Sequence, residues 1–266
     1  METRAITSAR NTLLKELRRA LARGGLTSDG YALAEGFHLL EEALQSRCEL
    51  GGILAAQSAL PKLEQRVEPL QGLRVTVVED KLFQSVATTE TSQGVIALVK
   101  PKPWAVEDLF NAESLVVVLD GVQDPGNAGT IVRAAEAFGA SGAVFVKGSV
   151  HPYHPKTLRA SAGSLFRLPI LYGIGADEVL RVLRQKGLER FAAMPAAQLR
   201  PDEVDFRRKC AIMIGSEAHG VSSCLREGAR QLSIPTSGVE SLNAAMAAAV
   251  LLYEASRQRR RPGGAA

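Results

Sequence analysis

The feature that most restricts the fold is an uninterrupted apolar run, Leu115–Leu119, followed directly by a polar loop, Asp120–Gly129. Five apolar residues in a row are typical of a strand that is buried on both faces. The next segment, Thr130–Phe138, predicts a helix that stops at Gly139, and Ala143–Val146 predicts another strand. Strand, helix and strand in this order form a βαβ unit, so the sequence predicts a parallel sheet.

The rest of the second half continues this alternation. Helices are expected over Ala176–Lys186 and Ser241–Arg257, and strands over Ala211–Ile214 and Leu232–Pro235. The stretch Ala244–Tyr253 is apolar on all sides, which is typical of a helix that is buried all round. In a chain of this size, a partner subunit is a natural way to bury such a helix.

The first half reads as a smaller α/β unit. Leucines at helical spacing with basic residues between them predict an amphipathic basic helix over 3–23, which ends at Gly24 and Gly25. Further helices are expected over 35–46 and 81–87, and strands over 51–55, 73–78 and 94–99. Pro101 and Pro103 then interrupt any helix or central strand. We therefore expect a first domain over 1–103, a linker over 104–112 and a second domain over 113–266.

Composition narrows the class of protein. The chain has 266 residues, a formal net charge of +4 and a pI near 9.1, which fits an anionic partner such as nucleic acid. Its three cysteines lie at no metal-ligand spacing, so neither a zinc site nor a disulfide framework is expected. No segment resembles a signal peptide or reaches the roughly 20 apolar residues of a membrane span. We expect a cytoplasmic protein without metal or membrane contact.

Three polar, glycine-containing loops each follow an apolar strand, and ligands of parallel sheets bind at the carboxyl ends of strands. The first loop, Asp120–Arg133, lacks both the P-loop ending and the G-x-G-x-x-G of dinucleotide folds. Asn127 could be no more than a helix N-cap. Arg133 could be no more than a solvated side chain, since it lies opposite the apolar side of the predicted helix. This loop alone does not decide between those interpretations and a functional one.

The other two loops raise similar alternatives. In Ile214–Val221, a lone His219 could suggest a hydrolase, but the G-x-S-x-G elbow is missing. In Ile234–Ala245, Ser241 is a reasonable N-cap for the last helix. That explanation leaves Asn243 inside the first turn, where asparagine is a poor helix former and needs a polar partner.

Taken together, the three loops resemble the motifs of the SpoU (TrmH) family of RNA 2′-O-ribose methyltransferases, within the SPOUT superfamily. Motif 1, N-x-G-x-x-x-R, is matched by Asn127, Gly129 and Arg133. Motif 2, I-G-x-E-x-x-G, is matched by Ile214, Gly215, Glu217 and Gly220. Motif 3 is matched by Ile234, Pro235, Ser241, Leu242 and Asn243. The resemblance covers about 113–258, and the segment from Pro155 to Phe166 resembles the rRNA-directed branch of the family.

The resemblance implies a fold, a cofactor and a set of site residues. It implies a parallel-sheet SPOUT domain with a deep trefoil knot, a homodimer, and S-adenosylmethionine as the methyl donor. Glu35-Gly36 and Thr91–Val95 resemble, more weakly, an L30e-like RNA-binding domain in the first half. The implied catalytic residues are Arg133, Asn127, Glu217, Ser241 and Asn243. The implied cofactor-binding residues are Ile214, Gly215, Gly220, Ile234, Leu242 and Met246.

The substrate is expected to be RNA. Arg159, Arg18 and Arg23 are the candidate RNA contacts, and the tail from Arg257 to Arg261 is another. A two-domain layout favours 23S ribosomal RNA over transfer RNA, by family-level analogy. The alternatives are a tRNA ribose methyltransferase, a non-catalytic RNA-binding dimer, and a nucleotide-binding α/β enzyme. Binding of S-adenosylmethionine, as opposed to ATP or NAD, separates the enzyme from the last two.

Overall fold

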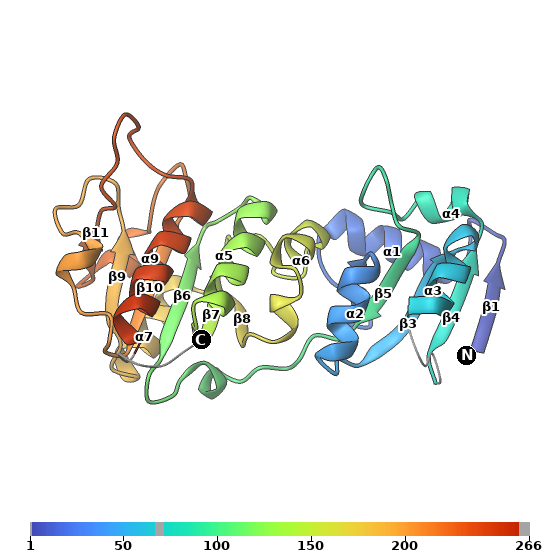
Figure 1. Ribbon diagram of the computed structural model, residues 1–266, viewed down its shortest axis with the longest axis horizontal. Helices are drawn as coiled ribbons and strands as arrows, with labels where there is room; N and C mark the ends of the chain where they lie inside the picture. The colour runs from blue at the N-terminus through green and yellow to red at the C-terminus, as the bar shows by residue number, and fades with distance from the viewer. Residues whose placement is uncertain (1, 67–71, 261–266) are drawn as a thin grey trace. The chain divides into compact units, whose positions relative to one another are not determined.

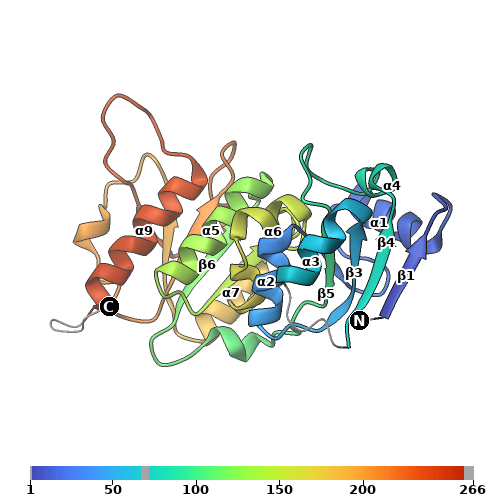
Figure 2. The ribbon, with the colours of Figure 1, turned by 45° about the vertical axis from the view of Figure 1, so that its right-hand side comes forward.

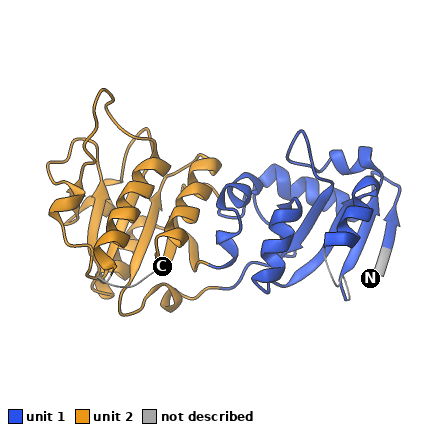
Figure 3. Cartoon of the chain, in the orientation of Figure 1, with its two compact units in different colours: residues 1–103, 152–167 blue, residues 104–151, 168–266 orange. Residues whose placement is uncertain are grey.

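The computed structural model of the chain describes residues 2–66 and 72–260. These residues form two compact units (Figure 3). The first unit contains the chain up to Pro103 together with residues 152–167, and the second contains 104–151 together with the residues from Leu168 onward. One passage between the units therefore lies between Pro103 and Trp104, where the two prolines interrupt the sequence.

The first unit is built around a mixed sheet in the order β1-β4-β3-β5-β2. Parallel pairing joins β1 to β4 and β4 to β3, whereas β5 is antiparallel to both β3 and β2. The strands are β1 (Glu2–Ile6), β2 (Ala32–Glu35), β3 (Leu50–Ala56), β4 (Arg74–Val78) and β5 (Val95–Val99). The helices are α1 (Thr12–Arg23), α2 (Phe37–Gln45), α3 (Leu60–Arg66), α4 (Asp80–Gln84) and α6 (Pro155–Ser161).

The N-terminal segment differs from its prediction. A single helix over 3–23 was expected, but residues 2–6 form strand β1 beside β4, and α1 begins only at Thr12. The helical spacing of leucines starts at Leu13, so nothing in residues 2–10 supports a helix. Asn11 caps α1 by accepting a hydrogen bond from the Leu13 amide at 2.9 Å. Gly24 ends the helix at φ +62°, a conformation that glycine adopts without strain.

The predicted boundary of the second domain also needs correction. Residues 152–167 were expected within a domain over 113–266, yet they belong to the first unit, where α6 packs against β2. Residues 104–112 were expected to form a linker, yet they belong to the second unit. Leu109 is fully buried there and belongs to the hydrophobic core cluster that includes Val116 and Val144. Burial of one leucine is enough to turn a polar-looking connection into part of a core.

The second unit is an α/β layer structure around a six-stranded parallel sheet in the order β11-β9-β10-β6-β7-β8. The predicted α/β class and parallel sheet are therefore confirmed. The strands are β6 (Leu115–Asp120), β7 (Gly142–Val146), β8 (Ile170–Ile174), β9 (Glu189–Ala193), β10 (Cys210–Gly215) and β11 (Arg230–Leu232). The helices are α5 (Pro125–Ala137), α7 (Ala176–Gln185), α8 (Ser223–Arg226) and α9 (Ala244–Arg259).

Strand alternation distributes the core between the two faces of this sheet. Val116 and Val118 of β6 pack with Leu183 of α7 in one hydrophobic cluster. Side chains at the intervening positions of a strand point to the opposite face, where α9 packs on β10. Helices α5 and α9 also pack on each other and lie side by side in Figures 1 and 2. This arrangement brings the first turns of α5 and α9 close to the ends of the central strands.

Helix α9 is only partly buried within one chain. Met246, Val250 and Tyr253 recur at helical spacing and are 58%, 42% and 49% exposed. Within one chain Ala244–Tyr253 is therefore not buried all round, and one apolar stripe of α9 stays open, so the predicted burial needs a partner subunit. Within residues 2–66 and 72–260, no helix combines the length and apolarity needed to cross a membrane.

Candidate active site

The loops that follow β6 and β10 leave the sheet side by side. The two strands pair in parallel with Ile214 beside Leu119 and Gly215 beside Asp120, so both strands end at the same level. Asp120 is nearly buried and accepts a hydrogen bond from the Ser222 amide at 2.6 Å. A single buried carboxylate thus ties the end of one strand to the far side of the next loop.

Helix α5 begins at Pro125, five residues before its predicted start at Thr130, and motif 1 lies within its first three turns. Asp124 is the N-cap, and its side chain accepts a hydrogen bond from the Asn127 amide at 2.7 Å. The interpretation of Asn127 as the N-cap is therefore wrong. Because Asp124 caps the helix, the Asn127 side chain is available for another contact. Its Nδ2 donates a hydrogen bond to Glu217 Oε1 at 2.5 Å, which joins motif 1 to motif 2.

Asn243 of motif 3 completes this connection. It is the N-cap of α9, and its Oδ1 accepts hydrogen bonds from the Ala245 amide at 2.9 Å and the Met246 amide at 3.4 Å. Its Nδ2 donates to Asn127 Oδ1 at 3.1 Å. Ser241 is therefore not the N-cap, and the polar partner that Asn243 required is Asn127. We call the hydrogen-bonded series Asn243–Asn127–Glu217 the amide relay.

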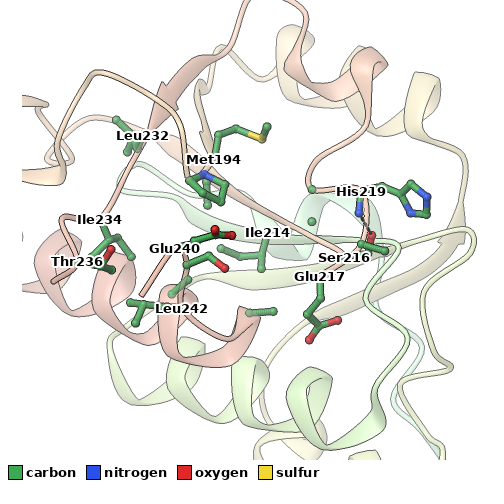
Figure 4. A pocket seen from close by; sticks show the side chains of 18 residues that line it. Met194, Ile214, Ser216, Glu217, His219, Leu232, Ile234, Thr236, Glu240 and Leu242 are labelled. Atoms are coloured by element: carbon green, nitrogen blue, oxygen red, sulfur yellow. Dashed lines mark hydrogen bonds between the residues drawn. The ribbon is translucent and has the colours of Figure 1, made fainter. Parts of the chain in front are cut away.

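A pocket of about 340 Å³ opens beside the amide relay. Its volume lies within the range of small-molecule sites. The lining comes from the ends of β9, β10 and β11 and from the start of α9 (Figure 4). Of the predicted site residues, those that line the pocket are Ile214, Gly215, Glu217, Gly220, Ile234, Ser241 and Leu242. Asn127, Asn243 and Arg133 are not among its lining residues.

Met246 is the predicted cofactor residue that the structure places elsewhere. Ala244 and Ala247 face the pocket, and Met246 is one residue from Ala247, about 100° around the helix. Its side chain belongs to the open apolar stripe of α9 instead. The start of α9 does line the pocket, but helical periodicity decides which of its side chains face it.

At Gly215 the backbone of the motif 2 loop lies closest to another part of the same loop. A Cβ atom added there would lie 1.9 Å from the carbonyl carbon of Gly220 and 2.2 Å from the Val221 nitrogen. The loop folds back on itself through a bridge between Ser216 and Gly220, and Gly220 adopts φ +65°. Two glycines are therefore needed because one permits the close approach of the backbone and the other permits the turn.

The charged groups of the pocket are mostly acidic. Glu217 and Glu240 contribute carboxylates, and no lysine or arginine occurs among the described residues that line it. In Figure 4 the Glu240 carboxylate lies among the lining side chains, and Glu217 extends toward α5, where it meets Asn127. The imidazole of His219 projects away from the other labelled side chains. A pocket with this charge suits a cationic ligand better than a phosphate-bearing one.

Arg133 lies on the exposed side of its helix, as the helical wheel predicted. It is exposed on α5, whereas Ile131, Val132 and Ala134 around it are buried. It has no hydrogen bond or ion pair with any residue that the structure describes. The leading catalytic candidate is therefore not held within a single copy of the chain.

The three arginines predicted to contact RNA all have partners inside the first unit. Arg18 donates to the Ala9 carbonyl and to Ser85 Oγ, and Arg23 pairs with Glu16 at 3.3 Å. Arg159 lies 3.9 Å from Glu35 and also donates to Thr88. Its side chain is 31% exposed. Each arginine thus orders its own surroundings.

The C-terminal tail was the other predicted RNA contact. Arg259 donates hydrogen bonds to main-chain carbonyls, including that of Phe206 at 2.7 Å, and Arg261 lies outside the described residues.

Glu35 forms the centre of a polar cluster that sequence reasoning did not identify. Its carboxylate is nearly buried and accepts hydrogen bonds from Thr88, Thr89 and Ser92. Burial raises the pKa of Glu35, but these hydrogen bonds outweigh burial, so the pKa lies below its ordinary value. The cluster fixes the segment before β5, which is the segment whose resemblance to an RNA-binding domain was noted.

Several pocket residues escaped the sequence analysis. Met194 and Pro195 follow β9, a strand that was not predicted, and Thr236 and Glu240 lie in the loop before α9. Glu240 lies within the span of motif 3, directly before Ser241, at a position that the motif does not specify. Within the described parts of the chain, no group of three or more histidine, cysteine or acidic residues could hold a metal ion.

Both halves of the chain match known protein families. The sequence profile of the SpoU rRNA Methylase family matches residues 114–253, and that of an MRM3-like substrate binding domain matches 11–97. The chain is 32% identical to the 23S rRNA (guanosine(2553)-2′-O)-methyltransferase RlmP of Bacillus subtilis. That alignment of 252 residues covers 93% of this chain and 97% of RlmP.

Two solved structures with bound AdoMet have the same fold. The rRNA methyltransferase from Sinorhizobium meliloti superposes with a TM-score of 0.80 at 27% identity, over 96% of this chain and 98% of that one. The SpoU methyltransferase AviRb from Streptomyces viridochromogenes also superposes with a TM-score of 0.80. It is 26% identical, over 94% of this chain and 98% of that one.

Proposed function

This chain belongs to the SpoU rRNA methylase family, and we propose that it methylates a ribose 2′-hydroxyl of 23S ribosomal RNA with S-adenosylmethionine as the donor. The observation that carries the proposal is the amide relay, which joins all three motifs beside a pocket of suitable size. A ribosomal substrate implies that the enzyme works in the cytoplasm. The RlmP relative supports large-subunit RNA as the substrate class.

The residues of the pocket fit this cofactor. S-adenosylmethionine is positively charged at its sulfur and its amino group and negatively charged at its carboxylate, so it is a net cation, and the lining offers carboxylates with no lysine or arginine. We propose that Gly215, Gly220, Ile234 and Leu242 hold it, together with Ile214, and that Met246 does not. The family resemblance supports extending the proposal to a trefoil knot formed by these loops. When bound, the cofactor supplies a methyl group that is already activated by the sulfonium.

The protein must then orient the ribose and help its hydroxyl lose a proton. Arginine is effectively always protonated, so we assign to Arg133 the positioning of the ribose and its phosphate, with a phosphate or water accepting the proton. Glu217 and Asn127 hold the loops of motifs 1 and 2 in place beside the pocket, because the amide relay connects both residues to the N-cap of α9. Ser241 of motif 3 lines the pocket and contributes a hydroxyl to it.

We further propose that the active form is a homodimer. The open stripe of Met246, Val250 and Tyr253 lies on α9, which packs on the helix that carries Arg133. A second copy that covers this stripe would bury apolar surface and supply surroundings for the unpartnered guanidinium. The first unit, which matches a substrate binding domain, would then bind the RNA. Because Arg18, Arg23 and Arg159 are paired internally, we assign them to shaping this unit as well as to RNA contact.

The test is transfer of label from methyl-labelled S-adenosylmethionine to ribosomal and transfer RNA, both taken from cells that lack this protein. Label recovered as a 2′-O-methylnucleoside from 23S RNA supports the proposal, and label in transfer RNA alone contradicts the substrate. Arg133→Ala is expected to abolish transfer while sedimentation still reports a dimer, because Arg133 is exposed and supports no described contact. Full activity of that variant would refute its role.

A further inference from the structure

One carboxylate of the pocket, that of Glu240, holds no other described part of the chain in place. Glu240 lies in the loop between β11 and α9, and Figure 4 shows its carboxylate among the apolar side chains of Met194, Ile214 and Ile234. It makes no hydrogen bond and no ion pair with the residues described by the structure. An uncompensated charge that faces a cavity favours an opposite charge on whatever enters it.

The second carboxylate of the pocket serves as a contrast. Glu217 is held by Asn127 at 2.5 Å and takes part in the amide relay, so it is committed to holding the loops together. The described lining contains no lysine or arginine, and the imidazole of its one histidine, His219, projects away from Glu240 (Figure 4). The charge of Glu240 is therefore left for the ligand.

The chemistry of the proposed reaction gives this charge a use. Methyl transfer breaks the bond between sulfur and the methyl carbon, forms a bond between that carbon and the ribose oxygen, and releases one proton from the hydroxyl. The sulfur changes from a cationic sulfonium to a neutral thioether. We propose that Glu240 recognises the sulfonium charge and so makes the pocket prefer S-adenosylmethionine to the product S-adenosylhomocysteine. This inference rests on the proposed function and deepens it.

The expected size of the preference follows from electrostatics. Opposite unit charges about 4 Å apart in water-like surroundings change a dissociation constant by roughly fivefold. Glu240 is exposed, so the estimate for water is the appropriate one. Loss of the carboxylate should therefore weaken the cationic cofactor about fivefold and leave the neutral-sulfur product unaffected.

Calorimetric titration of the full chain tests this with three probes: S-adenosylmethionine, S-adenosylhomocysteine and sinefungin, in which a carbon bearing a protonated amine replaces the methylsulfonium. In Glu240→Gln we expect binding of S-adenosylmethionine and sinefungin to weaken about fivefold and binding of S-adenosylhomocysteine to stay constant. Glu240→Asp should retain the preference. Glu64→Gln removes an exposed carboxylate from the first unit and should change none of the three affinities.

The possible outcomes separate this proposal from the one on which it rests. Equal weakening of all three probes by Glu240→Gln would mean a structural role or a contact to a group that the probes share, and it would overturn the proposal. Unchanged affinities would also overturn it. If the unsubstituted protein bound none of the probes, the proposed function itself would fail, and the inference with it.

Discussion

The side chain of Asn243 makes two kinds of hydrogen bond, and a pair of substitutions can separate the contributions of the two. Its Oδ1 caps α9 through the Ala245 and Met246 amides, and its Nδ2 donates to Asn127. Loss of an N-cap costs about 1 kcal/mol, and loss of a hydrogen bond of this type costs about 1 kcal/mol. Asn243→Ala should therefore lower the free energy of unfolding by about 2 kcal/mol. Asn243→Ser keeps a capping oxygen and should lose only about 1 kcal/mol.

The two variants should differ in stability but not in catalysis. Both lose the donor to Asn127, so both should lose about tenfold to a hundredfold in kcat, because a misplaced orienting group costs this much. Urea unfolding gives the stabilities, and single-turnover methyl transfer gives the rates. Asn11→Ala, which removes the N-cap of α1, is the matched control and should lose about 1 kcal/mol with kcat unchanged. Wild-type kcat in Asn243→Ser would refute the relay.

Two further substitutions probe the pocket and the first unit. Gly215→Ala should abolish cofactor binding and cost about 1–3 kcal/mol, since its Cβ would lie 1.9 Å from the Gly220 carbonyl carbon; retained binding by calorimetry would contradict this. The lowered pKa of Glu35 means that its carboxylate stabilises the fold above the unfolded pKa of about 4.5, and that this contribution is lost as the pH falls through the folded pKa. Glu35→Gln should thus have a lower free energy of unfolding than the wild type at pH 7, and this free energy should fall less than that of the wild type between pH 6 and pH 3. Urea unfolding measures both proteins, and an equal fall of the free energy in the two would argue against this.

The parts that sequence could predict are those whose signal is local. The apolar run that became β6 and its pairing with β10 follow from strands buried on both faces. The exposure of Arg133 follows from the helical wheel of α5. The three motifs are recognisable because each loop has glycines or amides that its backbone requires, as Gly215 shows.

The parts that sequence missed depend on contacts between distant segments. Asn243 looked unsuitable within a helix because the start of α9 was placed at Ser241, and only its position beside Asn127 explains it. Strand β1 could not be predicted because its pairing partner β4 lies about 70 residues away. Arg159 looked like a free phosphate contact, and nothing near it in sequence announces Glu35 as its partner. Glu240 lies at a position that motif 3 does not specify, although it faces the same pocket.

Because residues 152–167 belong to the first unit, the exchange of domains between relatives is constrained. A chimera that exchanges only residues 1–103 would import a new Glu35 cluster while keeping the old Arg159 and α6 against which it packs. The two stretches are far apart in the gene but form one folded body, so a crossover near Pro103 divides a cooperative unit. Exchange of the whole first unit between relatives therefore requires two segments, 1–103 and 152–167, because a single crossover leaves the original α6 in place.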